Sequence, residues 1–144
     1  MESDIHSYEM EPLQVLLVED NFGDVLLIRQ ALASEPYATD VRVARDGEQG
    51  LEILSDLQYK PDLVILDLNL PKLSGHTLLE RSHIDAPVII FSSSSNPDDL
   101  LRAFELGARE YVQKPTDLTE FTRQVSQIVR TWGRPEPIAA VAEA

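Results

Sequence analysis

Three short apolar runs, each leading into polar or acidic side chains, constrain the fold more than any other feature of the sequence. The runs are QVLLV at residues 14–18, PDLVILDL at 61–68 and APVIIFSSSS at 86–95. A continuous apolar run of this length is typical of a strand that is buried on both faces. Such strands belong to parallel sheets, whose crossover helices cover both faces.

The segments around these runs predict two further strands and five helices, in alternation with the buried strands. The additional strands are expected at residues 40–45 and 110–113, and the helices at 22–33, 46–57, 74–84, 97–106 and 118–132. In the last helix, Leu118, Phe121, Val125, Ile128 and Trp132 recur at a 3-4-3-4 spacing, which predicts one apolar stripe. Five strand-helix pairs in alternation predict an α/β, doubly wound parallel sheet.

The length and composition favour one globular domain. The 144 residues, 43% of them hydrophobic, are sufficient for a single core. We expect a flexible leader at residues 1–12, a folded domain at 13–133 and a disordered tail at 134–144. No room for an output domain remains after Trp132, so the sequence is either a stand-alone protein or a fragment of a longer one.

Charge and residue usage exclude several classes of site. The absence of cysteine excludes disulfides and thiolate metal sites, and the three histidines, His6, His76 and His83, lack a zinc-ligand spacing. A net charge of -13 disfavours nucleic-acid binding, and serves either solubility, a cation site or a basic partner. With neither a signal peptide nor an apolar run of roughly 18 residues, we expect a cytoplasmic protein without membrane contact.

Polar side chains end four of the five predicted strands. Glu19 and Asp20 follow the first strand, Asp67 ends the third, Ser92 ends the fourth and Lys114 follows the fifth. Because ligands bind at the carboxyl ends of strands in doubly wound sheets, we expect these side chains to form one site.

The residue types at this edge predict a phosphoryl site that contains magnesium. Three neighbouring carboxylates require a cation, and a few oxygen ligands favour Mg²⁺. Lys114 adds a positive charge and Ser92 a hydroxyl donor, both suited to the negative charge of a phosphoryl group. Asp67 can then act as a nucleophile and form an acyl phosphate.

Four motifs resemble the receiver domains of two-component response regulators. These are LLVEDN, DLVILDLNLPKLSG, PVIIFSSS and AFELGAREYVQKP, and the resemblance covers residues 14 to 132. The successive steps along the chain are 47 residues from Asp20 to Asp67, 25 to Ser92 and 22 to Lys114, all usual for that family. The resemblance implies a flavodoxin-like, five-stranded sheet of order 2-1-3-4-5 with five helices.

The resemblance also implies a role for each site residue. Asp67 would be the phosphoacceptor, and Asp20 and Asp67 would ligate Mg²⁺ together with the backbone carbonyl of Asn69. Glu19 would bind the metal through water. The side chains of Asn69 and Ser94 occupy positions that bias hydrolysis of the acyl phosphate.

Lys114 and two switch residues complete the implied site. Lys114 would contact the phosphoryl oxygens, and its bond to Pro115 is often cis in the family. Ser92 would move to hydrogen-bond the phosphoryl group while Tyr111 turns inward. Threonine is more common than serine at the position of Ser92, although the hydroxyl is kept.

The implied function is that of a phosphoacceptor rather than an enzyme, with phosphorylation and autodephosphorylation at Asp67 only. The donor would be the phosphohistidine of a sensor histidine kinase or of a histidine phosphotransfer protein. The start VEDNFGDVLLIRQAL, with the late Trp132, is similar to regulators that partner phytochrome-type kinases. Phosphorylation would change the face formed by residues 97–106, 110–113 and 118–132, for a partner or for a homodimer.

Other interpretations remain open at this point. Asp20 with Asn21 could cap a helix, Asp67 could be a turn acid, Lys114 a solvated charge, the serine run a polar loop and Tyr111 an edge-strand aromatic. A magnesium-dependent phosphatase would need a second carboxylate where Asn69 stands. A flavin-binding carrier would need a Ser/Thr/Gly-rich loop after the first strand, where two acids would repel the flavin phosphate.

Overall fold

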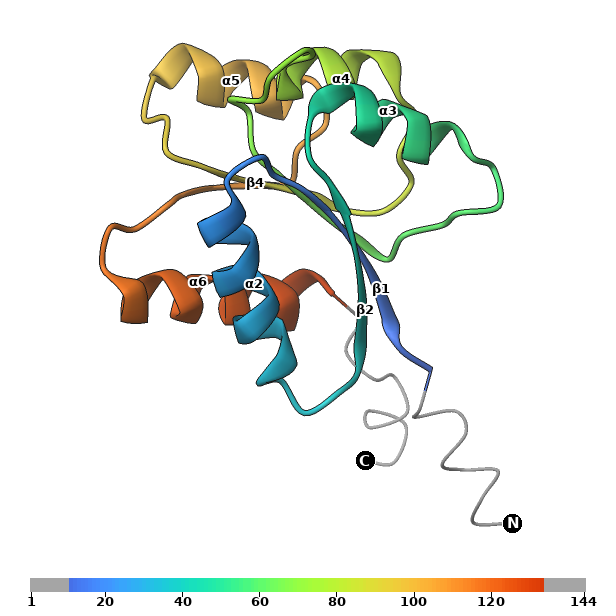
Figure 1. Ribbon diagram of the computed structural model, residues 1–144. Helices are drawn as coiled ribbons and strands as arrows, with labels where there is room; N and C mark the ends of the chain where they lie inside the picture. The colour runs from blue at the N-terminus through green and yellow to red at the C-terminus, as the bar shows by residue number, and fades with distance from the viewer. Residues whose placement is uncertain (1–10, 134–144) are drawn as a thin grey trace, which may run out of the picture.

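The computed structural model describes residues 11–133, which form a five-stranded parallel sheet with helices on both faces (Figure 1). The strands are β1 (Leu13–Val18), β2 (Thr39–Ala44), β3 (Leu63–Leu66), β4 (Val88–Ser92) and β5 (Glu110–Gln113). The helices are α2 (Phe22–Ala33), α3 (Gly47–Ser55), α4 (Gly75–Arg81), α5 (Pro97–Glu105) and α6 (Leu118–Trp132). The order β2-β1-β3-β4-β5 confirms the predicted fold class.

Two apolar cores lie on opposite faces of the sheet. Helices α2 and α6 pack on one face, where the rings of Phe91 and Phe121 meet edge to face with centroids 5.0 Å apart. Helices α3, α4 and α5 cover the other face, as Figure 1 shows. Every residue of β3 is fully buried, as expected for a central strand with helices on both sides.

Each helix begins at a side chain that caps its first turn. Asn21, Asp46, Ser74, Asn96 and Asp117 each accept a hydrogen bond from a backbone N–H two or three residues later. Such caps satisfy amide groups that have no partner inside the helix. Residues 46 and 74, where two helices were predicted to begin, are therefore caps just outside them.

Several details differ from the sequence prediction. Helices α3 and α4 end at Ser55 and Arg81, earlier than predicted, because their C-caps Asp56 and Ser82 already have extended backbone. Leu118 is 63% exposed and lies outside the apolar stripe of α6. No peptide bond in the described part of the chain is cis, so the bond from Lys114 to Pro115 is trans.

The predicted termini are only partly covered by the structure. Of the predicted leader, only Glu11 and Pro12 fall in the described region, and the predicted tail at 134–144 lies outside the described residues. Among the helices of residues 11–133, none is both long and apolar enough to cross a membrane.

Candidate functional site

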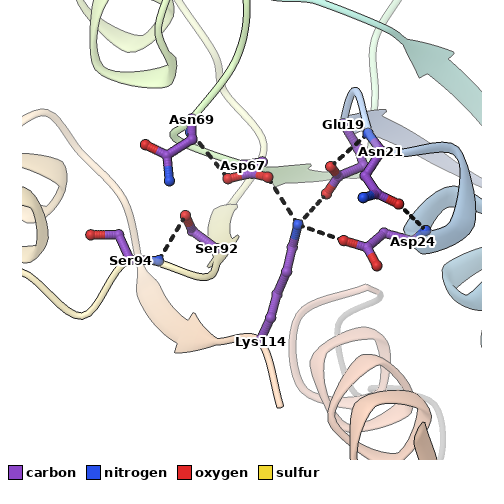
Figure 2. A network of polar contacts seen from close by, with 8 residues as sticks. All are labelled: Glu19, Asn21, Asp24, Asp67, Asn69, Ser92, Ser94 and Lys114. Atoms are coloured by element: carbon purple, nitrogen blue, oxygen red, sulfur yellow. Dashed lines mark hydrogen bonds and ion pairs between the residues drawn. The ribbon is translucent and has the colours of Figure 1, made fainter. Parts of the chain in front are cut away.

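The carboxyl ends of β1, β3, β4 and β5 bring four predicted site residues to one edge of the sheet, namely Glu19, Asp67, Ser92 and Lys114 (Figure 2). Backbone hydrogen bonds continue the ladder just past the strands. The N–H of Asp67 donates to the carbonyl of Val18 at 3.0 Å, and that of Lys114 to the carbonyl of Ser92 at 2.8 Å. The backbone that carries Asp67 and Lys114 is therefore held in place by the sheet.

The ammonium of Lys114 lies at the centre of the site. Its Nζ is 2.7 Å from Oε1 of Glu19, 2.8 Å from Oδ2 of Asp24 and 2.9 Å from Oδ2 of Asp67 (Figure 2). The lysine side chain is only 7% exposed. Since an ammonium has three N–H donors, these three carboxylates match its full donor capacity.

Three carboxylates form an acidic group that could hold a cation. Glu19, Asp20 and Asp67 each offer an oxygen, and these oxygens lie within 4.8 Å of one another. Glu19 and Asp67 are buried, whereas Asp20 is exposed to solvent. An all-oxygen donor set that is open to water on one side fits a hard divalent ion such as Mg²⁺, which keeps several water ligands.

Asn69 lies directly beside the acidic group. Its backbone N–H donates to Oδ1 of Asp67 at 3.1 Å, which fixes one oxygen of that carboxylate while Lys114 contacts the other. The loop that carries Asn69 passes very close to the start of α4. A Cβ atom on Gly75 would lie 2.7 Å from the carbonyl oxygen of Asp67, so only glycine allows this approach.

Burial and neighbouring charges shift the pKa values of the two central groups. Burial raises the pKa of Glu19 to about 7, and the negative charge of Asp67 adds to this, although the hydrogen bond from Lys114 opposes it. Burial alone would lower the pKa of Lys114. The hydrogen bonds to Asp24 and Glu19 and the charge of Asp67 outweigh it, so the pKa is raised and the lysine stays charged.

The two predicted switch residues are linked through the loop that follows β4. Ser92 is fully buried, and its Oγ accepts a hydrogen bond of 3.4 Å from the N–H of Ser94 (Figure 2). The hydroxyl of half-buried Tyr111 donates to the carbonyl oxygen of Ser94 at 2.9 Å. Because both residues hydrogen-bond to the backbone of Ser94, a movement of Ser92 would be transmitted to Tyr111.

Asp24 belongs to the site but was not predicted from the sequence. It lies in the first turn of α2, where an acid is common because the positive end of the helix dipole stabilises a negative charge. The available signal was its position three residues after the capping Asn21, close to the end of β1.

Comparisons with known proteins agree with the fold. The family model for the response regulator receiver domain matches residues 15–126. The crystal structure of the phosphorylated cyanobacterial phytochrome response regulator RcpA is similar, with a TM-score of 0.77 and 32% identity over 85% of this chain and 94% of that one. The Mn²⁺-bound form of response regulator Rcp1 has a TM-score of 0.79 and 29% identity over 87% of this chain and 97% of that one.

The curated relatives include larger enzymes. Protein-glutamate methylesterase/protein-glutamine glutaminase 1 of Myxococcus xanthus is 42% identical over 105 residues, which are 72% of this chain and 30% of the enzyme. The chain therefore spans less than a third of the length of that relative.

Proposed function

The chain belongs to the response regulator receiver domain family of two-component signalling, and on that premise we propose that residues 13–133 are a receiver domain that accepts a phosphoryl group on Asp67. The proposal rests on the position of the Asp67 carboxylate. One of its oxygens contacts Lys114 at 2.9 Å, the other accepts the N–H of Asn69, and two further acids stand beside it.

The transfer is a displacement at phosphorus. An oxygen of Asp67 attacks the phosphoryl group of a phosphohistidine, the new P–O bond forms, and the P–N bond breaks with its electron pair on the leaving imidazole. Lys114 places its positive charge where the phosphoryl oxygens arrive. A magnesium ion held by Asp20, Asp67, the backbone carbonyl of Asn69 and, through water, Glu19 would neutralise further charge.

Phosphorylation then acts on a two-state switch. Ser92 turns its hydroxyl toward the phosphoryl group and Tyr111 follows, because both contact Ser94. This change biases the surface of α5, β5 and α6. The exposed apolar side chains of Leu101 and Phe104 on α5 support a role for this surface in binding a partner or a second copy of the chain.

The proposed donor is a sensor histidine kinase of the phytochrome type, or a histidine phosphotransfer protein, in the cytoplasm. Support for a phytochrome-type kinase comes from the similarity to RcpA, whose structure is described as a phytochrome response regulator. For residues 13–133 we propose the role of a phosphoacceptor, whose chemistry is phosphorylation and autodephosphorylation at Asp67.

Acetyl phosphate with Mg²⁺, followed by intact mass measurement, tests the proposal. The wild-type protein should gain one phosphoryl group, and Asp67→Asn should gain none. Asp40→Asn, which changes an exposed aspartate of β2, is the matched control and should be labelled like the wild type. An unmodified wild type, or an Asp67→Asn variant labelled to the same extent, would overturn it.

A further inference from the structure

The three carboxylates that share Lys114 are not equivalent. Glu19 and Asp67 also belong to the acidic group, which in the described part of the chain comprises these two residues and Asp20. Asp24 lies outside that group, although its Oδ2 is 2.8 Å from the lysine Nζ. A bound cation and a phosphoryl group would both draw on Glu19 and Asp67, whereas Asp24 would remain available to Lys114.

The local structure of α2 frees the carboxylate of Asp24 for this contact. Asn21 caps the helix by accepting the N–H of Asp24 at 2.9 Å. In a complete capping box, the acid at this third helical position would accept the N–H of the cap residue in return. Here that N–H donates to Oε2 of Glu19 instead, at 3.1 Å. The carboxylate of Asp24 is thereby left to reach Lys114 from outside the sheet.

We propose that Asp24 is a positioning residue, which holds the Lys114 ammonium in place while the cation and the phosphoryl group engage the other two carboxylates. The inference rests on the proposed function, because it concerns the lysine that meets the phosphoryl group. Of the three lysine donors, one passes from Asp67 to a phosphoryl oxygen during transfer. The contact from α2 keeps the ammonium directed into the site throughout.

A simpler role for Asp24 would be to stabilise the start of α2 through its charge. The chain contains a matched control for that role. Glu120 occupies the same third position of α6, where its N–H donates to the cap residue Asp117, and it pairs with the exposed Arg123. Glu120→Ala removes a first-turn acid without removing a contact to Lys114.

The first experiment measures initial rates of phosphorylation by acetyl phosphate with saturating Mg²⁺. Asp24→Ala should be slower than the wild type by about 3- to 10-fold, because a misplaced catalytic group lowers the rate. Asp24→Asn keeps an oxygen acceptor and should stay within about twofold of the wild type, since positioning needs the hydrogen bond more than the charge. Glu120→Ala should match the wild type.

A double-mutant comparison shows whether Asp24 acts through the lysine. In a Lys114→Gln background, Asp24→Ala should cause no additional loss of rate. Three results would overturn the proposal: a wild-type rate for Asp24→Ala, an equal loss in both backgrounds, or an equal increase in rate for Asp24→Ala and Asp24→Asn. The last result would mean that Asp24 only repels the anionic donor.

A measurement without phosphorylation separates this proposal from the proposed function. With Mg²⁺ present, NMR should detect faster exchange of the Lys114 Nζ protons with water in Asp24→Ala than in Asp24→Asn or the wild type. Equal exchange in all three would overturn the positioning role. If the wild type is not phosphorylated, the proposed function fails, and the exchange rates alone decide the role of Asp24.

Discussion

The Nζ atom of Lys114 lies 2.9 Å from Oδ2 of Asp67, although 47 residues separate the two along the chain. The contact forms because β3, β4 and β5 are parallel neighbours whose carboxyl ends meet at one edge. Both side chains are nearly buried, at 7% exposure each. Because the pair is buried, replacing either residue should change the stability of the fold as well as the site.

Replacing Lys114 should destabilise the metal-free protein. Lys114→Met leaves the buried carboxylates of Glu19 and Asp67 without their cationic partner. We expect a loss of about 3 kcal/mol in the free energy of unfolding at pH 8, because breaking a buried ion pair leaves uncompensated charge. Urea denaturation in the presence of a chelator measures this loss, and Mg²⁺ should reduce it by supplying another positive charge.

Lys72→Met is the control for the loss of a lysine. Lys72 is 61% exposed and lies 3.7 Å from Asp46, so its removal should cost less than about 1 kcal/mol. Equal losses for the two variants would show that the buried cluster around Lys114 does not contribute as described.

The stability of the metal-free protein should depend on pH through Glu19. Because its pKa is raised from 4.5 to about 7, the folded protein keeps a proton that the unfolded chain releases between these values. The folded state therefore binds more protons in this window, and the contribution of Glu19 to stability falls as pH rises from 4.5 to 7, by about 3 kcal/mol at most.

Glu19→Gln isolates this effect, since glutamine does not titrate. We expect the variant to gain stability over the wild type as pH rises through the same window, measured by urea denaturation with a chelator present. A stability difference that is constant, or that shrinks as pH rises, would contradict the raised pKa of Glu19.

Ser92→Ala should uncouple Tyr111 from the site. Beryllofluoride with Mg²⁺ mimics the phosphoryl group and should shift the NMR signals of the Tyr111 ring in the wild type. In Ser92→Ala the shift should be largely lost, because the hydroxyl that would draw the loop after β4 is missing. Ser95→Ala changes an exposed serine of the same loop and should respond like the wild type. An unchanged response in Ser92→Ala would rule out this coupling.

The packing of α6 on the sheet depends strongly on one aromatic ring. Phe121→Ala removes the edge-to-face contact with Phe91 and leaves a cavity, so we expect a loss of about 3–5 kcal/mol in the free energy of unfolding. Phe22 is 60% exposed, and Phe22→Ala should cost less than about 1 kcal/mol. Chemical denaturation of both variants compares them, and similar losses would contradict the assigned core.

The sequence was sufficient to predict the site residues that lie at the ends of strands. Glu19, Asp67, Ser92 and Lys114 each end or directly follow a strand, and the edge of a parallel sheet brings such positions together. The order of the strands was implied by the family resemblance instead, because the apolar patterns alone do not state which strands are neighbours.

Two residues show where prediction from sequence failed. Asp24 resembles any first-turn acid, and its contact to Lys114 spans 90 residues, which no local pattern reveals. Leu118 has the correct spacing for the apolar stripe of α6, yet it is exposed at the first residue of the helix. Periodicity indicates which side of a helix faces the core, but not how far along the helix the core extends.

Locating the modified residue determines whether Asp67 receives the phosphoryl group. The protein is treated with acetyl phosphate and Mg²⁺, reduced with borohydride, which converts an aspartyl phosphate to homoserine, and digested for peptide mass mapping. We expect homoserine at position 67 and at no other aspartate. Homoserine at Asp20 or Asp24, or unmodified peptides throughout, would contradict it.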